Sequence, residues 1–498
     1  MSHFEHTSLG AAGLPADLDE AAHRCLVAGF DGATSVPDPL KELVDRGLGG
    51  VILFTRNIRD ARQVRRLTDE LRAIRPDVIV AIDNEGGGIG HLVAAGAPGA
   101  PDVPGSYALG VVDDPNLTAR CADALAAHLA GLGITAAYAP VADLRHRPDN
   151  PIVRTRSFGA DPELAARHLR AWITATEARG IASCAKHFPG HGGTVTDSHL
   201  GMAVDPRPYD ALGVDLEPFR AAVDAGVPML MSAHVVFPAL DPNRPATLSR
   251  RILGDLLRHD LGFDGVLVSD ALEMKAIADE YGEAAGARIA LAAGADQVIV
   301  AVCDLNVTLH CRDAVLDALR TGVLAEERIQ EAAGRVRLLA GRYATPPTSD
   351  PAGWDADAGI EAARRAVRSR GVPPAVRGAH VVDLFPPPHP ALNWGGEDLL
   401  SEMRAADPTA TGTAVTGECA DPDSLVEGIV RRCGAAPLVV ATCDAGLHPW
   451  QVRLRDALSV RRPDAVRVDT GLPEGGVLCS YGRGRVNLRA VAEVLAGL

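Results

Sequence analysis

The run VIVAID, residues 78–83, holds five apolar residues and ends in an aspartate. The segment before it, DARQVRRLTDELRAI at 60–74, places its apolar residues three and four positions apart, which is the spacing of one face of an α-helix. A short, nearly continuous apolar run after such a segment is typical of a strand buried on both faces of a parallel sheet. The two segments together predict one helix-and-strand unit of an α/β fold.

Similar apolar runs recur over the first 340 residues. They are CLVAGF (25–30), GVILFT (50–55), ITAAYAP (134–140), ASCAKH (182–187), PMLMSAH (228–234), GVLVSD (265–270) and QVIVAV (297–302). Segments with helical spacing, such as PELAARHLRAWITATEARG at 162–180, lie between them. Eight such units over residues 1–340 predict a TIM-like (β/α)8 barrel with insertions. An open doubly wound sheet is the alternative.

A second domain is expected after residue 340. The segment GRYATPPTSDPAGWD, 341–355, contains three prolines and predicts an interdomain linker. Beyond it, the strand-like runs are AHVVDLF (379–385), PLVVATC (437–443), AVRVDTG (465–471) and GVLCSYG (476–482). They predict a smaller α/β sandwich domain over residues 356–498.

The composition argues against some classes of binding partner and some cellular compartments. A formal net charge of −15 argues against a nucleic-acid-binding protein, which would need a basic face. No apolar run reaches the roughly 18 residues of a membrane-spanning helix. The first twenty residues show neither the basic nor the apolar region of a signal peptide. The nine cysteines show no CxxC spacing, and Cys25, Cys184 and Cys303 lie in or beside apolar runs, so we expect reduced, buried thiols in a cytoplasmic protein. None of these features determines the oligomeric state.

Polar residues stand where several of the predicted strands end. They are Asp83, Asp143, Lys186 with His187, His234 and Asp270. In a (β/α)8 barrel the carboxyl ends of all strands share one face, and active sites lie there. One polar strand end can simply begin a loop, but five on one rim predict an active site.

The stretch CAKHFPGHGGTVTDSHLG, 184–201, allows three interpretations. A metal site would use His187, His191, Asp197 and His199. The His-x3-His spacing is a good zinc pair only on a helix, which the proline and glycines of this stretch oppose. A solvated loop with incidental histidines is the second interpretation. The third is catalytic: at i, i+2 spacing Asp197 and His199 point the same way from an extended segment, so the carboxylate can orient the imidazole.

These residues also carry a family resemblance. KHFPGHGGTVTDSH, 186–199, resembles the K-H-F-P-G-H-G-x4-D-S-H loop of glycoside hydrolase family 3 enzymes of the β-N-acetylglucosaminidase type. VLVSDALEMKAI (266–277) resembles their nucleophile segment. Further similar segments are VILFTRN (51–57), DNEGG (83–87), APVADL (139–144), NPIVRTRSFG (150–159) and LGFDG (261–265). The resemblance covers most of residues 20–340 and implies a (β/α)8 barrel.

The resemblance implies a retaining hydrolase that removes a terminal β-linked N-acetylglucosamine-like sugar through a glycosyl-aspartate intermediate. It implies Asp270 as nucleophile, His199 as acid/base with Asp197 as its partner, and Asp83, Arg156, Lys186 and His187 as sugar-binding residues. A retaining glycosidase needs a carboxylate at the anomeric carbon and an acid at the leaving oxygen, and these residue types supply both. No metal and no organic cofactor is expected, and the expected partner is a small carbohydrate or glycoside.

The sequence departs from the family at His91, which stands where a sugar-contacting arginine is expected after DNEGG. An imidazole does not reproduce the bidentate fork of a guanidinium, so that binding role is not carried over. The exact sugar therefore stays open, including an amino sugar on a small metabolite. A β-N-acetylglucosaminide phosphorylase, a metal-dependent hydrolase and a sugar-binding protein without turnover also remain, although the intact Asp197, His199 and Asp270 argue against the last.

Overall fold

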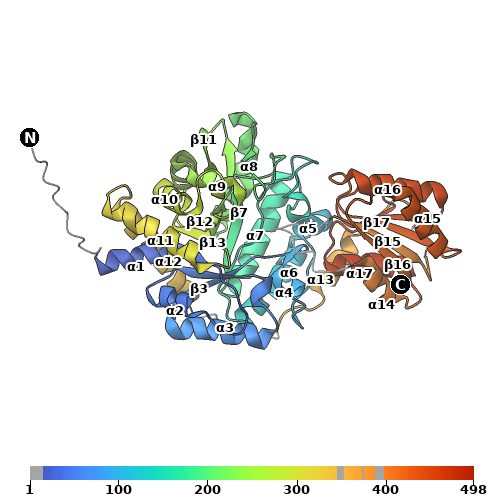
Figure 1. Cartoon of the computed structure of the whole chain (residues 1–498), viewed down its shortest axis with the longest axis horizontal. Coiled ribbons are helices and arrows are strands. Elements are labelled where there is room, and N and C mark those ends of the chain that lie inside the picture. Colours follow the sequence, from blue (N-terminus) through green and yellow to red (C-terminus); the bar gives the residue numbers. More distant parts are fainter. Residues whose placement is uncertain (1–14, 345–352, 373–374, 387–397) are drawn as a thin grey trace, which may run out of the picture.

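The computed structural model describes residues 15–344, 353–372, 375–386 and 398–498 of the chain. In Figure 1 a large helix-covered barrel, coloured blue to yellow, lies beside a smaller α/β domain in orange and red. The barrel carries the candidate site, and the smaller domain packs against one side of it.

Eight parallel strands close the barrel in the order β1-β13-β12-β9-β7-β6-β3-β2. Their bounds are β1 (Leu26–Ala28), β2 (Gly50–Leu53), β3 (Ile79–Ile82), β6 (Ala136–Ala137), β7 (Ala182–Phe188), β9 (Met229–Ser232), β12 (Val266–Ala271) and β13 (Gln297–Val300). Each lies within or overlaps one of the eight predicted runs. The barrel prediction is confirmed, and the open-sheet alternative is wrong.

Helices follow the strands and cover the barrel (Figure 1). The α-helices are α1 (Ala16–Arg24), α2 (Asp38–Asp45), α3 (Ala61–Ile74), α4 (His91–Ala94), α5 (Ser106–Val112), α6 (Pro115–Gly131), α7 (Pro162–Ala178), α8 (Tyr209–Asp224), α9 (Lys275–Ala278), α10 (Glu283–Ala293), α11 (Leu305–Arg320) and α12 (Glu326–Tyr343). The 3₁₀ turns η1 (Thr55–Asn57), η2 (Arg154–Arg156) and η3 (Ala246–Leu248) and the π-helix η4 (Arg251–Asp260) complete them. Aspartates 60, 114, 161 and 304 fix four of the helix starts, because each side chain accepts a hydrogen bond from a backbone N–H of the first turn.

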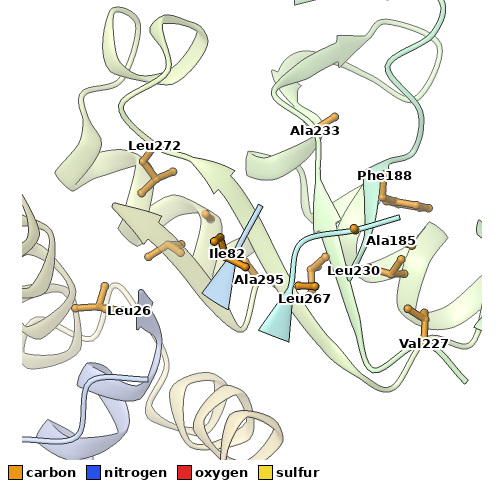
Figure 2. Close-up of a cluster of buried hydrophobic side chains, with 14 of the residues drawn as sticks. Leu26, Ile82, Ala185, Phe188, Val227, Leu230, Ala233, Leu267, Leu272 and Ala295 are labelled. Carbon is orange, nitrogen blue, oxygen red and sulfur yellow. The ribbon is translucent and has the colours of Figure 1, made fainter. Parts of the chain in front are cut away.

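Alternating side chains along the strands divide the core into two apolar clusters. Figure 2 shows the cluster that packs between strands and helices, with Leu26, Ile82, Leu230 and Leu267. The neighbouring strand residues, such as Val27, belong to a second cluster inside the barrel. Because successive strand residues face opposite ways, strands buried on both faces must be apolar throughout, which is why the runs are nearly continuous.

Small insertions follow the carboxyl ends of three barrel strands. β4 (Asn84–Gly86) and β5 (Ile89–Gly90) form an antiparallel hairpin after β3. A three-stranded sheet joins β8 (Ala203–Val204), which follows β7, to β10 (Val235–Phe237) and β11 (Asp241–Pro245), which follow β9. These insertions build the walls of the rim where the polar strand ends lie.

The second domain contains a six-stranded sheet in the order β14-β19-β18-β17-β15-β16. Its strands are β14 (Arg368–Ser369), β15 (His380–Phe385), β16 (Thr411–Thr416), β17 (Leu438–Thr442), β18 (Val466–Asp469) and β19 (Leu478–Cys479). Its helices are α13 (Ala358–Ala366), α14 (Leu399–Ala406), α15 (Pro422–Cys433), α16 (Pro449–Arg461) and α17 (Arg485–Ala496). The four predicted strands are present, whereas β14 and β16 were not predicted because these edge strands are short or polar and largely exposed. Residues 345–352 of the predicted linker lie outside the described residues, so the domain boundaries stay predictions.

The cysteines and the helices can be compared with what the sequence led us to expect. All nine cysteines are free, and Cys25 and Cys184 are buried as expected. Cys303 is exposed instead, because it lies in the turn after β13 has ended. Within the described ranges, no helix has both the length and the apolar character needed to cross a membrane.

Candidate active site

A cavity of about 290 Å³ opens at the carboxyl ends of the barrel strands. Its lining includes six of the predicted site residues, which are Asp83, Arg156, Lys186, His187, His199 and Asp270. The seventh, Asp197, lies behind the lining and is hydrogen-bonded to His199. The structure therefore brings together residues that are up to 187 positions apart in the sequence.

Asp270 lies near the end of β12, and its Oδ1 accepts the backbone N–H of Ala271 at 2.8 Å. Burial raises the pKa of this carboxyl, but the nearby His187, His234 and His199 and the N–H of Ala271 outweigh burial and lower the pKa to about 2. Asp270 is consequently ionised at neutral pH, as a carboxylate nucleophile has to be.

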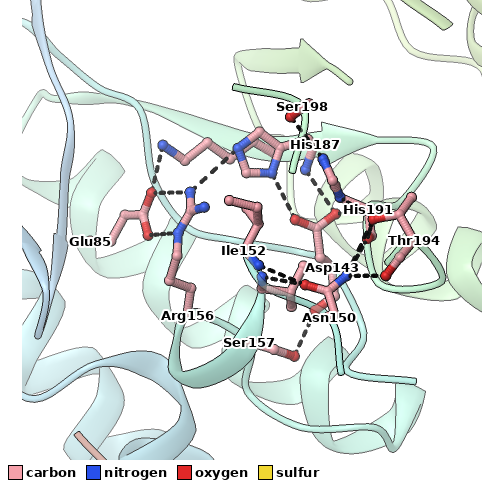
Figure 3. A network of polar contacts seen from close by, with 12 residues as sticks. Glu85, Asp143, Asn150, Ile152, Arg156, Ser157, His187, His191, Thr194 and Ser198 are labelled. Carbon is pink, nitrogen blue, oxygen red and sulfur yellow. Dashed lines mark hydrogen bonds and ion pairs between the residues drawn. The ribbon is translucent and has the colours of Figure 1, made fainter. Parts of the chain in front are cut away.

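A charge network built around Glu85 forms one wall of the cavity (Figure 3). The Arg156 guanidinium donates two hydrogen bonds to Glu85, both at 2.9 Å. The Nζ of Lys186 lies 2.7 Å from Glu85 Oε1 and 2.6 Å from Asp83 Oδ1. Burial raises the pKa of Glu85, but Arg156 and Lys186 outweigh it and hold that pKa far below its usual range. The Asp83 side chain is 22% exposed against 3% for those of Lys186 and Glu85, so Asp83 is the most exposed member of the network.

His187 is held by Asp143 on one side and faces Arg156 on the other. Its Nδ1 lies 2.7 Å from Asp143 Oδ2, and its Nε2 lies 3.4 Å from Arg156 Nη2. Because the guanidinium can only donate, we assign the ring proton to Nδ1 and the lone pair to Nε2. Asp143 also accepts the backbone N–H groups of His187 and His191, and Lys186 pairs with Asp83 and Glu85 instead.

The glycine-rich loop after β7 is fixed by His191. Its Nδ1 lies 2.9 Å from Thr194 Oγ1 and its Nε2 lies 3.0 Å from Ser198 Oγ. Burial lowers the pKa of His191 to about 4, so the ring is neutral. Gly192 packs so closely that a Cβ there would lie 1.6 Å from the carbonyl oxygen of Leu144. The crowding of glycines in this stretch therefore has a steric cause.

The same loop presents the dyad. Asp197 Oδ1 accepts hydrogen bonds from Nδ1 and from the backbone N–H of His199. The Asp197 side chain is 5% exposed and that of His199 is 23% exposed, so the imidazole reaches the cavity from a buried carboxylate. Among the described residues, no three His, Cys, Asp or Glu side chains gather as metal ligands would. Of the four candidates of the metal interpretation, His187 pairs with Asp143, His191 pairs with Ser198, and Asp197 and His199 pair with each other.

Sequence reasoning assigned no role to Glu85, to Glu273 or to the ring contacts of His234. Glu85 follows Asp83 by two residues in the segment DNEGG, and that i, i+2 spacing was the available signal. Glu273 lines the cavity and accepts the N–H of Ala301 at 3.1 Å. His234 is tied to Thr247 Oγ1 and to the carbonyl of Ala271, beside the Asp270 carboxylate.

His91 also lines the cavity. Its Nδ1 lies 2.9 Å from Thr55 Oγ1 and its ring meets the edge of Phe54. Burial lowers the pKa of this imidazole, so at neutral pH it does not supply the charge of the guanidinium that the family resemblance places there.

Comparison with known proteins identifies relatives for most of the chain. The model of the glycosyl hydrolase family 3 N-terminal domain matches residues 12–339. The β-hexosaminidase of Pseudomonas aeruginosa PAO1 is 39% identical over 293 residues, covering 58% of this chain and 84% of its own. β-Hexosaminidase A of Pseudoalteromonas piscicida is 32% identical over 334 residues, covering 61% of this chain but 55% of its own length. The structure of a family 3 β-N-acetylglucosaminidase from Paenibacillus sp. superimposes with a TM-score of 0.86 at 30% identity and covers 96% of both chains.

Proposed function

The chain belongs to glycoside hydrolase family 3, and on that premise we propose that it is a retaining β-N-acetylglucosaminidase that releases a terminal β-linked N-acetylglucosamine-like sugar from a small glycoside. The observation that carries the proposal is the placing of an ionised Asp270 and the Asp197–His199 dyad at one cavity.

In the first step the Asp270 carboxylate attacks the anomeric carbon. The bond from that carbon to the leaving oxygen breaks while the bond to Asp270 forms, and His199 gives its proton to the leaving oxygen. In the second step His199 takes a proton from water, the water oxygen bonds to the anomeric carbon, and the Asp270 carboxylate is released. Asp197 stabilises the imidazolium form of His199, which enters the first step and is re-formed in the second.

In this proposal the charged wall orients the sugar. Asp83, Arg156, Lys186 and His187 offer charged or polar atoms at the cavity surface, and hydrogen bonds from charged groups to sugar hydroxyls are the strong ones. Because Glu85 balances the two buried cations, the wall can keep its charges without a ligand. For the compartment, we propose the cytoplasm, since free and mostly buried thiols suit a reducing environment.

Phosphorolysis is the second candidate, favoured by the identity of the base. A neutral imidazole does not repel an incoming phosphate as a carboxylate base would. Water is nevertheless favoured as the acceptor, because the cavity cations Lys186 and Arg156 are both already paired with carboxylates.

The test uses aryl β-glycosides of N-acetylglucosamine, N-acetylgalactosamine and glucose. We expect the N-acetylglucosaminide to be cleaved with the largest kcat/KM and proton NMR to show the β-anomer as the first product. An α-anomer at early times would contradict the mechanism, and a preference for the glucoside would contradict the sugar. The same assay with tens of millimolar phosphate decides the acceptor, because sugar 1-phosphate in place of free sugar would identify a phosphorylase.

A further inference from the structure

The second domain contacts the active-site rim through one buried arginine of the barrel. Arg154 lies in η2, and its side chain is only 5% exposed. Its Nη2 lies 2.8 Å from Asp444 Oδ1 and 3.1 Å from Glu474 Oε1. Asp444 follows β17 and Glu474 follows β18, so the carboxyl edge of the second domain's sheet receives this arginine.

Backbone geometry singles out the same junction. The described residues include four non-glycine residues with positive φ, and three of them are Arg154, Asp444 and Tyr481. The Tyr481 ring stacks on Tyr107 of the barrel, with centroids 5.8 Å apart. Such backbone conformations are costly for residues with a Cβ and persist only where surrounding contacts hold them. Residues on both sides of the junction therefore adopt strained backbone conformations where the two domains meet.

The segment that Arg154 anchors leads directly into the site. Arg156, two residues further on in η2, makes the bidentate contact with Glu85 and faces His187. The second domain also touches the hairpin that carries Glu85, since a Cβ at Gly484 would lie 3.2 Å from the Cα of Gly87.

The other end of the segment holds the dyad loop (Figure 3). Asn150 Oδ1 accepts the N–H groups of Ile152 and Val153, which fixes the start of the turn. Its Nδ2 donates to the carbonyl oxygens of His191 and Thr194, at 2.9 and 3.0 Å. Residues 150–156 thus connect three parts of the molecule, which are the second domain, the charged wall and the glycine-rich loop.

We propose that Arg154 is a positioning residue through which the second domain holds residues 150–156 in the geometry that sugar binding and proton transfer require. Arg154 does not line the cavity, and its effect passes through Arg156 on one side and Asn150 on the other. The inference rests on the proposed function only for its kinetic readout.

The kinetic test compares Arg154→Gln with Arg365→Gln. Arg365 also joins the two parts of the molecule, by an exposed ion pair with Asp114 at 2.8 Å, but it contacts no residue of the site. We expect Arg154→Gln to raise KM and to lower kcat/KM by roughly ten- to a hundredfold, as displacement of a positioning segment does, and Arg365→Gln to stay within about twofold of the parent. Arg154→Lys, which keeps the charge, should recover part of the loss.

Hydrogen exchange gives a readout that does not depend on turnover. Amides of residues 148–159 and 188–200 should exchange faster in Arg154→Gln than in the parent, and not in Arg365→Gln. Glu474→Gln and Asp444→Asn loosen the same contact from the second domain and should reproduce the pattern if Arg154→Gln does not fold. Parent-like kinetics and exchange in Arg154→Gln, Glu474→Gln and Asp444→Asn would overturn the proposal. An inactive parent protein would contradict the proposed function, and the exchange data would still decide the role of Arg154.

Discussion

Asp197 Oδ1 accepts two hydrogen bonds from His199, one from the backbone N–H at 2.8 Å and one from Nδ1 at 2.9 Å. One carboxylate oxygen thus fixes the backbone and the ring of the same residue. With Nδ1 directed at the carboxylate, the imidazole tautomer is set, and Nε2 is the nitrogen that exchanges a proton with the substrate in the mechanism we propose.

His199→Ala should slow cleavage of glycosides with poor leaving groups by about 10²–10⁴-fold, since that is the usual contribution of a general acid. Glycosylation by a dinitrophenyl glycoside should suffer much less, because that leaving group needs no proton. Pre-steady-state release of the phenol measures this step. Asp197→Ala should show a milder form of the same pattern, and an equal loss across leaving groups would contradict the assignment.

Asp270→Asn should lower kcat by roughly 10⁴-fold or more on every substrate, because the amide cannot form the glycosyl ester. The amide has the same shape and can still accept the N–H of Ala271 through Oδ1. We therefore expect circular dichroism and Tm to show an intact fold. Residual turnover well above this level would place the nucleophile elsewhere.

Glu273→Gln should change how stability depends on pH. Burial and the neighbouring Asp270 raise the pKa of Glu273 from 4.5 to about 7. Between these two values the folded state binds more protons than the unfolded state, so the free energy of unfolding falls as pH rises. Such a shift corresponds to roughly 3 kcal/mol lost between pH 4.5 and 7, and the glutamine variant lacks this loss.

The comparison requires urea unfolding of both proteins at pH 5 and at pH 8.5. The free energy of unfolding of the glutamine variant, relative to that of the parent, should be higher at pH 8.5 than at pH 5. Parallel pH profiles would contradict the raised pKa of Glu273.

Gly192→Ala should displace the glycine-rich loop, because the new Cβ would lie 1.6 Å from the Leu144 carbonyl oxygen. We expect a loss of several degrees in Tm and a large loss of activity, as an overpacked site produces. Gly201→Ala is the matched control in the same segment, since a Cβ there meets no atom within 4 Å. Similar behaviour of the two variants would show that the steric contact is not what fixes the loop.

The barrel could be predicted from the sequence because its strands are buried on both faces. That burial forces nearly continuous apolar runs such as the one around Val80, and each run ends where the barrel rim begins. The edge strand β16 gave no such signal, because only Val415 of its six residues is buried. A strand buried on both faces has an apolar composition, whereas an exposed edge strand has a composition similar to that of a loop.

Some residues of the candidate site could be predicted because they are polar residues at the ends of apolar strands. Positions such as Lys186 and Asp270 end apolar strands, so their polarity stands out in the sequence. The pairing among them depends on distances across the barrel, which no local pattern contains. Glu85 pairs with Arg156 although the two are 71 positions apart, and Asp143 pairs with His187 and not with Lys186.

The buried contact of Arg154 with Asp444 and Glu474 also limits how the two domains can be exchanged between relatives. A chimera that joins this barrel to a foreign second domain would bury a guanidinium without its counter-charges, and the reverse chimera would bury two carboxylates without theirs. If Arg154 has the positioning role we propose, we expect an exchange of domains to preserve the site only when these three residues are kept together.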